Sequence, residues 1–113
     1  MSVDTGTGTA VMTNAVGAAC KRLWGRGPRD VRLLFANDDT VVLLLNGILT
    51  DAERTLLAVD RDGAVRSART VLHQALEPEV RVILEKNLGR ECHAFVAGVD
   101  MARDLVALVV TLH

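Results

Sequence analysis

Two short runs of aliphatic residues constrain the fold of this chain more than any other feature. Residues 41–45 and 105–110 are apolar at every position, without the alternation with polar residues that marks a strand with one solvent-exposed face. Strands of this kind are normally covered on both faces. The helices of so short a chain can cover one face, so we expect a second subunit to cover the other and predict a homodimer. The interface candidates are Val41, Leu43, Leu45, Leu105 and Val109.

The composition indicates a single small domain with an aliphatic core. Of the 113 residues, 50% are hydrophobic, and only Trp24, Phe35 and Phe95 are aromatic. A chain of this length has room for one core. It also exposes much surface for its volume, so this much aliphatic content favours further burial at a subunit interface.

The charged residues exclude several kinds of partner. Thirteen basic and fourteen acidic residues give a net charge of −1, and the two signs are interleaved along the chain. No cluster of Lys and Arg typical of a nucleic-acid groove or of an anionic membrane surface is present. No apolar run approaches the roughly 20 residues that span a bilayer. We therefore expect a cytoplasmic protein that binds no nucleic acid, is not inserted in a membrane and reaches one only peripherally, through a partner. In that compartment Cys20 and Cys92 are reduced thiols.

Hydrophobic spacing and turn residues predict the element order α-β-β-α-α-β-β. The expected helices span residues 10–24, about 50–59 and 64–88, and the expected strands span residues 30–36, 40–46, 91–97 and 104–112. Residues 1–9 are expected to form a disordered tail, and residues 10–113 a single α+β domain. Two hairpins joined by helices predict one four-stranded, mostly antiparallel sheet with its helices mainly on one face.

Several residues predict where the helices begin, end or bend. Thr50 and Glu53 have the spacing of a capping box at the start of the second helix. Gly25 predicts the end of the first helix, and Gly89 predicts the end of the third. Pro78 lies inside the third helix and is expected to kink or divide it, because proline lacks the backbone N–H and crowds the preceding turn.

A set of short motifs spread over residues 10–112 resembles one known family. The motifs are Gly25-Arg26-Gly27-Pro28 after the first helix, Asp38-Asp39 in the first hairpin, Gly47-Ile48-Leu49-Thr50 with Glu53, Gly89-Arg90 before the third strand, and Asp104 opening the last strand. In this combination the chain resembles the MpsC family, short prokaryotic domains linked to a sodium-translocating, membrane-potential-generating system. The resemblance implies a small soluble accessory subunit of a cation or bicarbonate uptake system, with a membrane transport protein as a candidate partner. It supplies no catalytic residues.

Four arginines are candidates for binding an anion or a partner. Arg26 lies in the glycine-rich loop, Arg90 precedes the third strand, and Arg66 and Arg69 are near neighbours on the third helix. Glycine-rich loops that bind phosphate open a helix, whereas this loop follows one, so the alternative interpretation is a helix stop and chain reversal. For Arg66 and Arg69 the alternative is an ordinary solvated helix face.

No group of residues predicts a catalytic or metal site, and no cofactor is implied. The three histidines are scattered, and the adjacent Cys92 and His93 point to opposite faces of a strand. Asp38 and Asp39 have turn chemistry. We therefore expect a non-catalytic, dimeric accessory or regulatory interaction module. The alternative is a small-molecule or anion-binding sensor, which a pocket with converging Arg or His side chains would favour.

Overall fold

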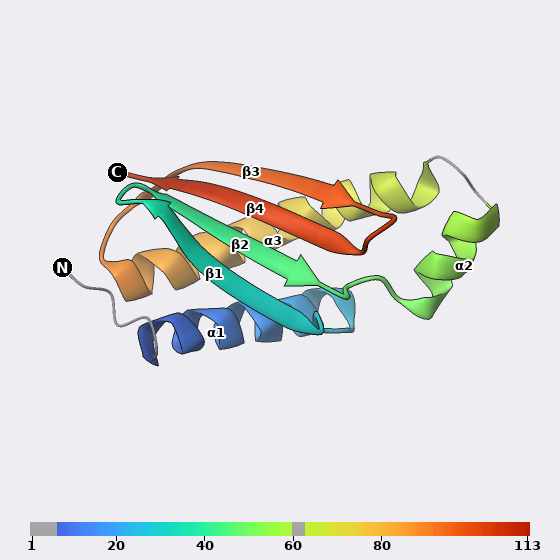
Figure 1. Ribbon diagram of the computed structural model, residues 1–113, viewed down its shortest axis with the longest axis horizontal. Helices are drawn as coiled ribbons and strands as arrows, with labels where there is room; N and C mark the ends of the chain where they lie inside the picture. The colour runs from blue at the N-terminus through green and yellow to red at the C-terminus, as the bar shows by residue number, and fades with distance from the viewer. Residues whose placement is uncertain (1–6, 60–62) are drawn as a thin grey trace.

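The computed structural model describes residues 7–59 and 63–113 and confirms the predicted α+β order (Figure 1). Its elements are α1 (Thr7–Trp24), β1 (Asp30–Asn37), β2 (Thr40–Asn46), α2 (Asp51–Val59), α3 (Ala64–Leu88), β3 (Cys92–Asp100) and β4 (Leu105–Leu112). The molecule is elongated, with principal extents of 49 × 24 × 21 Å.

The four strands form one sheet in the order β1-β2-β4-β3, and all three pairings are antiparallel. The two aliphatic runs of the sequence are therefore the two central strands, β2 and β4. Each hairpin contributes one central and one edge strand, so β1 and β3 each have a single neighbour.

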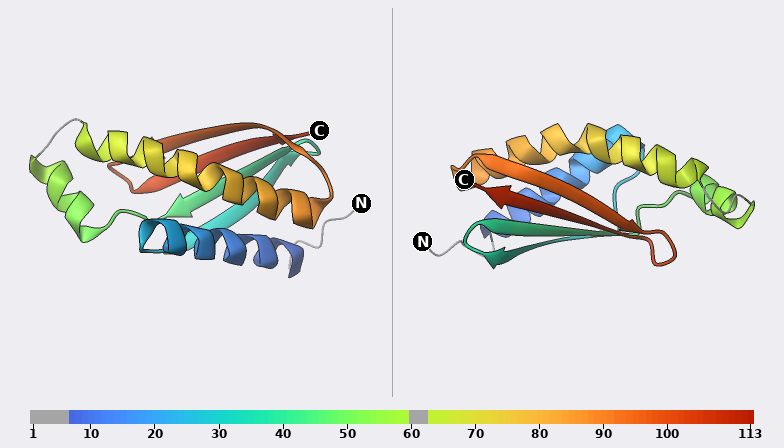
Figure 2. Two further views of the ribbon diagram at one scale, coloured as in Figure 1. Left: turned by 180° about the vertical axis from the view of Figure 1, so that it is seen from behind. Right: turned by 90° about the horizontal axis from the view of Figure 1, so that it is seen from above.

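Two helices cover one face of this sheet and leave the other face open. Figure 2 shows α1 and α3 side by side on the same side of the sheet. Between them and the sheet lies the core, which is aliphatic as predicted. The most deeply buried core side chains are 0–2% exposed. They include Met12, Val16, Cys20, Val41, Leu43, Leu45, Leu76, Val80, Leu84, Val106, Leu108 and Val110.

Helix α2 stands apart from this core. Figure 1 shows it beyond the end of the sheet, and none of its residues is buried. Leu56 and Val59 are 44% and 76% exposed on it. Burial in the core therefore cannot account for the position of α2.

The predicted helix ends are confirmed, and α3 runs on through its proline. Gly25 and Gly89 have φ of 79° and 67°, the left-handed region that glycine adopts without a steric penalty. Their amides donate to the Lys21 and Glu85 carbonyls at 2.9 Å. Helix α3 is not divided at Pro78, because buried residues on both sides of it pack against the core.

Other boundaries differ from the sequence prediction. Helix α1 begins at Thr7 instead of residue 10, and residues 1–6 of the expected tail lie outside the described part of the chain. The loop predicted for residues 98–103 is shorter, because Gly98 pairs with Ala107 and extends β3 to Asp100. An irregularity between Cys92 and Phe95 places both on the core side, whereas strict alternation along a strand would put residues 92 and 95 on opposite faces.

Candidate functional site

The uncovered face of the sheet is apolar along its centre. The strand registers place Leu34, Val42, Val109 and Val96 in one row across all four strands. Leu44 and Ala107 lie beside each other in the next row. Leu34 and Val96 are 50% and 61% exposed. A continuous aliphatic row on a face that no described helix covers is a candidate docking surface. We call these six residues the open face.

The interface candidates from the sequence divide between the two sides of the sheet. Val41, Leu43 and Leu45 are 0% exposed in the core beneath the helices, so they cannot contact a second subunit in this fold. Leu105 and Val109 are on the uncovered side. The apolar runs correctly indicate strands with two apolar faces, but every second residue of each run belongs to the core.

Arg69 is the largest fully buried side chain, which contradicts the interpretation of a solvated helix face. It is 1% exposed, and its Nη2 donates to the Ile48 carbonyl at 2.8 Å and to the Glu53 carboxylate. Its guanidinium carbon lies 5.0 Å from the centre of the Trp24 ring, a cation–π contact. Arg69, on α3, thus contacts α1, α2 and the segment between β2 and α2.

The capping box predicted from the sequence is part of the same arrangement. The Glu53 amide donates to Thr50 Oγ1 at 3.1 Å, and the Thr50 amide donates to the Glu53 carboxylate at 2.9 Å. Glu53 therefore caps α2 and neutralises Arg69 at once. Its side chain is 15% exposed, so the Arg69–Glu53 ion pair is largely shielded from water.

Asp104 forms hydrogen bonds with the same segment between β2 and α2. Its Oδ1 accepts the amides of Ile48 and Leu49 at 2.8 and 3.0 Å. Its Oδ2 accepts a hydrogen bond from Arg54 Nη2 at 2.9 Å, and its carbonyl oxygen accepts one from the Gly47 amide at 3.0 Å. Asp104 has a φ of 53°, a conformation that aspartate tolerates better than most residues.

Arg26 completes this set of contacts. Its Nη1 donates to the Leu49 carbonyl at 2.8 Å. The contacts centred on Arg26, Glu53, Arg69 and Asp104 all converge on residues 47–50 and the start of α2, and we call them the α2 junction. Much of the family-like pattern of the sequence, residues 25–28, 47–50, 53 and 104, therefore lies at one place.

The four candidate arginines do not form one anion-binding cluster. Arg90 lies at the opposite end of α3 from Arg66 and Arg69, and α3 has 25 residues, which is roughly 37 Å at helical rise. Arg90 joins the hairpin tip to the C-terminus: its donors reach the Asp38 carbonyl at 2.5 Å, the Asp39 carboxylate at 2.6 Å and the His113 carbonyl at 2.9 Å. Of these four arginines, only Arg66 has an exposed guanidinium without a described partner.

Burial disfavours the charged forms of the two thiols and of His73. Burial raises the pKa of the Cys20 thiol to about 12. Burial, with a smaller contribution from Glu85, raises the pKa of Cys92. Burial and then the neighbouring Arg69 guanidinium lower the pKa of His73 below its ordinary value of 6.5. In the part of the chain that the structure describes, no three His, Cys, Asp or Glu residues are grouped as metal ligands would be.

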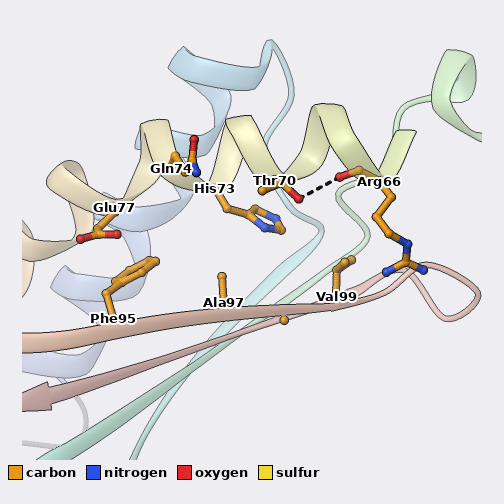
Figure 3. Close-up of a pocket in the computed structure, with 9 residues that line it drawn as sticks. Arg66, Thr70, His73, Gln74, Glu77, Phe95, Ala97 and Val99 are labelled. Atoms are coloured by element: carbon orange, nitrogen blue, oxygen red, sulfur yellow. Dashed lines mark hydrogen bonds between the residues drawn. The ribbon is translucent and has the colours of Figure 1, made fainter. Parts of the chain in front are cut away.

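A groove of about 390 Å³ runs between α3 and the edge strand β3 (Figure 3). Arg66, Thr70, His73, Gln74 and Glu77 line it from α3, and Phe95, Ala97, Gly98 and Val99 line it from β3. His73, which the sequence showed only as an isolated histidine, thus lines the same groove as Arg66, with Thr70 between them along α3. The i, i+4, i+7 and i+11 spacing of residues 66, 70, 73 and 77 places them on one helix face, but nothing local in the sequence shows that this face borders β3.

Comparison with known families gives one match. The family model described as the Na⁺-translocating membrane potential-generating system (MpsC) matches residues 4–113, nearly the entire chain. Comparisons with curated proteins and with solved structures returned no match. None of the helices in residues 7–59 and 63–113 is both long and apolar enough to cross a membrane.

Proposed function

The chain belongs to the MpsC family, and from this premise we propose that it is a non-catalytic, dimeric accessory subunit of a membrane system that moves cations. The family description links it to a Na⁺-translocating system, which is consistent with an accessory role beside a membrane-embedded protein. The observation that carries the proposal is the uncovered apolar face of the sheet.

The proposed occupant of the open face is a second copy of the chain. None of the six residues of the open face is charged, and Arg32, which lies beside Leu44 in the same row, forms an ion pair with Asp30. Two copies related by a two-fold axis can therefore bring the six apolar residues together. Two sheets pack face to face about 10 Å apart with interdigitated side chains. Such packing would remove Leu34 and Val96, which are 50% and 61% exposed, from water.

The proposed contact with the membrane protein is made by α2. This helix buries none of its own residues, yet the α2 junction fixes its start with a nearly buried ion pair and a buried arginine. Leu56 and Val59 remain exposed on it. Polar contacts that hold an unburied helix away from the core, with two large apolar side chains exposed on it, favour a role in presenting that helix to another protein. In this proposal the chain is cytoplasmic and reaches the membrane only through that partner.

An affinity pull-down tests the proposal. The tagged protein is recovered from its own cells in mild detergent, and the bound proteins are identified by mass spectrometry. We expect a cation or bicarbonate transport protein in fixed ratio with the chain. The substitution Val59→Asp should release that protein, whereas Val71→Asp, at a residue 63% exposed on α3, should retain it. Recovery of no membrane protein, or equal loss with both variants, would contradict the proposal.

A further inference from the structure

The groove between α3 and β3 has two polar groups that lack partners. The Nε2 atom of His73 is buried and makes no hydrogen bond, and the residue is 6% exposed. A buried polar atom without a partner is costly, since it loses its hydrogen bond to water without replacement. The Arg66 guanidinium, seven residues earlier on the same helix, forms no ion pair with any described carboxylate. Figure 3 shows both side chains extending from α3 toward β3.

The opposite wall of the groove is apolar and its centre is lined by small residues. Phe95, Ala97 and Val99 face α3 from β3, as Figure 3 shows. Ala97 is small and exposed, which keeps the middle of the groove open. The volume of about 390 Å³ lies within the range of small-molecule sites, roughly 300–1,000 Å³.

The charges around the groove favour an anion at one end. Glu77 is the single carboxylate among the lining residues, and Arg81 Nε binds it at 2.9 Å. Arg66 is therefore the unbalanced charge of the lining. Guanidinium groups bind carboxylates in a bidentate manner, and such charge-assisted hydrogen bonds are stronger than neutral ones.

We propose that this groove binds a small organic carboxylate. The carboxylate pairs with Arg66, the apolar body lies on Phe95, Ala97 and Val99, and His73 Nε2 forms a hydrogen bond with a polar group of the ligand. This site replaces Arg26 and Arg90 as the location of a ligand-sensing function, because the guanidinium groups of those two residues already bind carbonyls of the chain itself. The inference does not rest on the proposed dimer, whose open face is on the other side of the sheet.

Titration with three probe compounds tests the site. Benzoate has both the charge and an apolar body, benzamide has the same shape without the charge, and acetate has the charge without the body. The readouts are the imidazole NMR signals of His73 and the melting temperature of the protein. We expect saturable shifts with benzoate, and much weaker binding of benzamide and acetate.

Three variants make the test specific. Arg66→Gln should weaken benzoate binding about tenfold or more, the loss expected for a charge-assisted hydrogen bond. Ala97→Leu should fill the groove and abolish binding while the circular dichroism spectrum stays unchanged. Arg32→Gln, an exposed arginine on the opposite side of the sheet, is the matched control and should bind as the unchanged protein does. No saturable response to benzoate, equal binding of benzamide, or full binding by Ala97→Leu would each overturn the proposal.

Discussion

Replacing Glu53 by alanine is the sharpest test of the α2 junction. The change removes the carboxylate that pairs with Arg69 and also removes the acceptor for the Thr50 amide. Arg69 would keep one hydrogen bond, to the Ile48 carbonyl, and its contact with the Trp24 ring. Its Nε and Nη1 atoms already lack partners. A guanidinium that is 1% exposed would therefore be left without a counter-charge.

The expected cost follows from this geometry. Removing one partner of a buried ion pair typically costs about 3–5 kcal/mol, because the remaining charge stays buried without compensation. Glu53 is 15% exposed, so water can partly replace it, and we expect the lower end, about 3 kcal/mol. The free energy of unfolding of small domains is about 5–15 kcal/mol, so a loss of this size should lower the denaturation midpoint measurably.

Urea denaturation of four variants compares the free energy contributed by the buried Arg69–Glu53 pair with that of an exposed ion pair. Glu79→Ala is the matched control, since Glu79 also pairs with an arginine between two helices but both side chains are 40% or more exposed. It should cost less than about 1 kcal/mol. Arg69→Met removes the buried charge, so adding Glu53→Ala to it should cost about 2 kcal/mol less than Glu53→Ala alone. A cost of Glu53→Ala no larger than that of Glu79→Ala, or additive costs in the double variant, would refute the reasoning.

Three further changes test other parts of the structure. Thr50→Ala should cost about 1 kcal/mol through loss of the cap on α2, and an unchanged urea midpoint would show that the cap contributes nothing. Gly47→Ala should cost about 1–2 kcal/mol or more, because φ is +69° and the added carbon would lie 2.8 Å from Arg29 Cβ; normal thermal stability would contradict this. The free energy of unfolding should be highest above pH 6.5 and fall as the pH drops toward the lowered folded-state pKa of His73, because the unfolded chain binds the proton more readily. His73→Leu should flatten that part of the pH profile, and an unaltered profile would argue against a neutral buried imidazole.

Periodicity predicted the fold well but could not assign faces to the central strands. A run such as residues 41–45 is apolar on both sides, so nothing local distinguishes the residues beneath the helices from those on the open face. The hairpin register and the position of α1 and α3 decide it: Leu43 pairs with Leu33 and Leu108 on the core side, and Val42 pairs with Leu34 and Val109 on the other. The pairing of β2 with β4 and the packing of the helices join residues far apart in the chain, which a single sequence does not reveal.

The burial of Arg69 could have been predicted from its spacing along α3, although its charge favoured an exposed position. It lies four residues after Val65 and seven before Leu76, so it is on the buried stripe of α3, and the structure buries all three. An arginine in an apolar stripe needs a counter-charge, and Glu53 supplies it. The identity of that partner depends on how α2 meets α3, which no local pattern contains. The role of Asp104 was beyond prediction for the same reason, since its contacts are 50 or more residues away.

The measurement that tests the central claim most directly is the mass of the protein by light scattering at micromolar concentration. We predict twice the 12.2 kDa mass of the chain. Val109→Lys, in the centre of the open face, should give the mass of a single chain, whereas Val71→Lys on the exposed side of α3 should remain dimeric. A single-chain mass for the unchanged protein, or a dimer that survives Val109→Lys, would contradict the account that this face joins two copies.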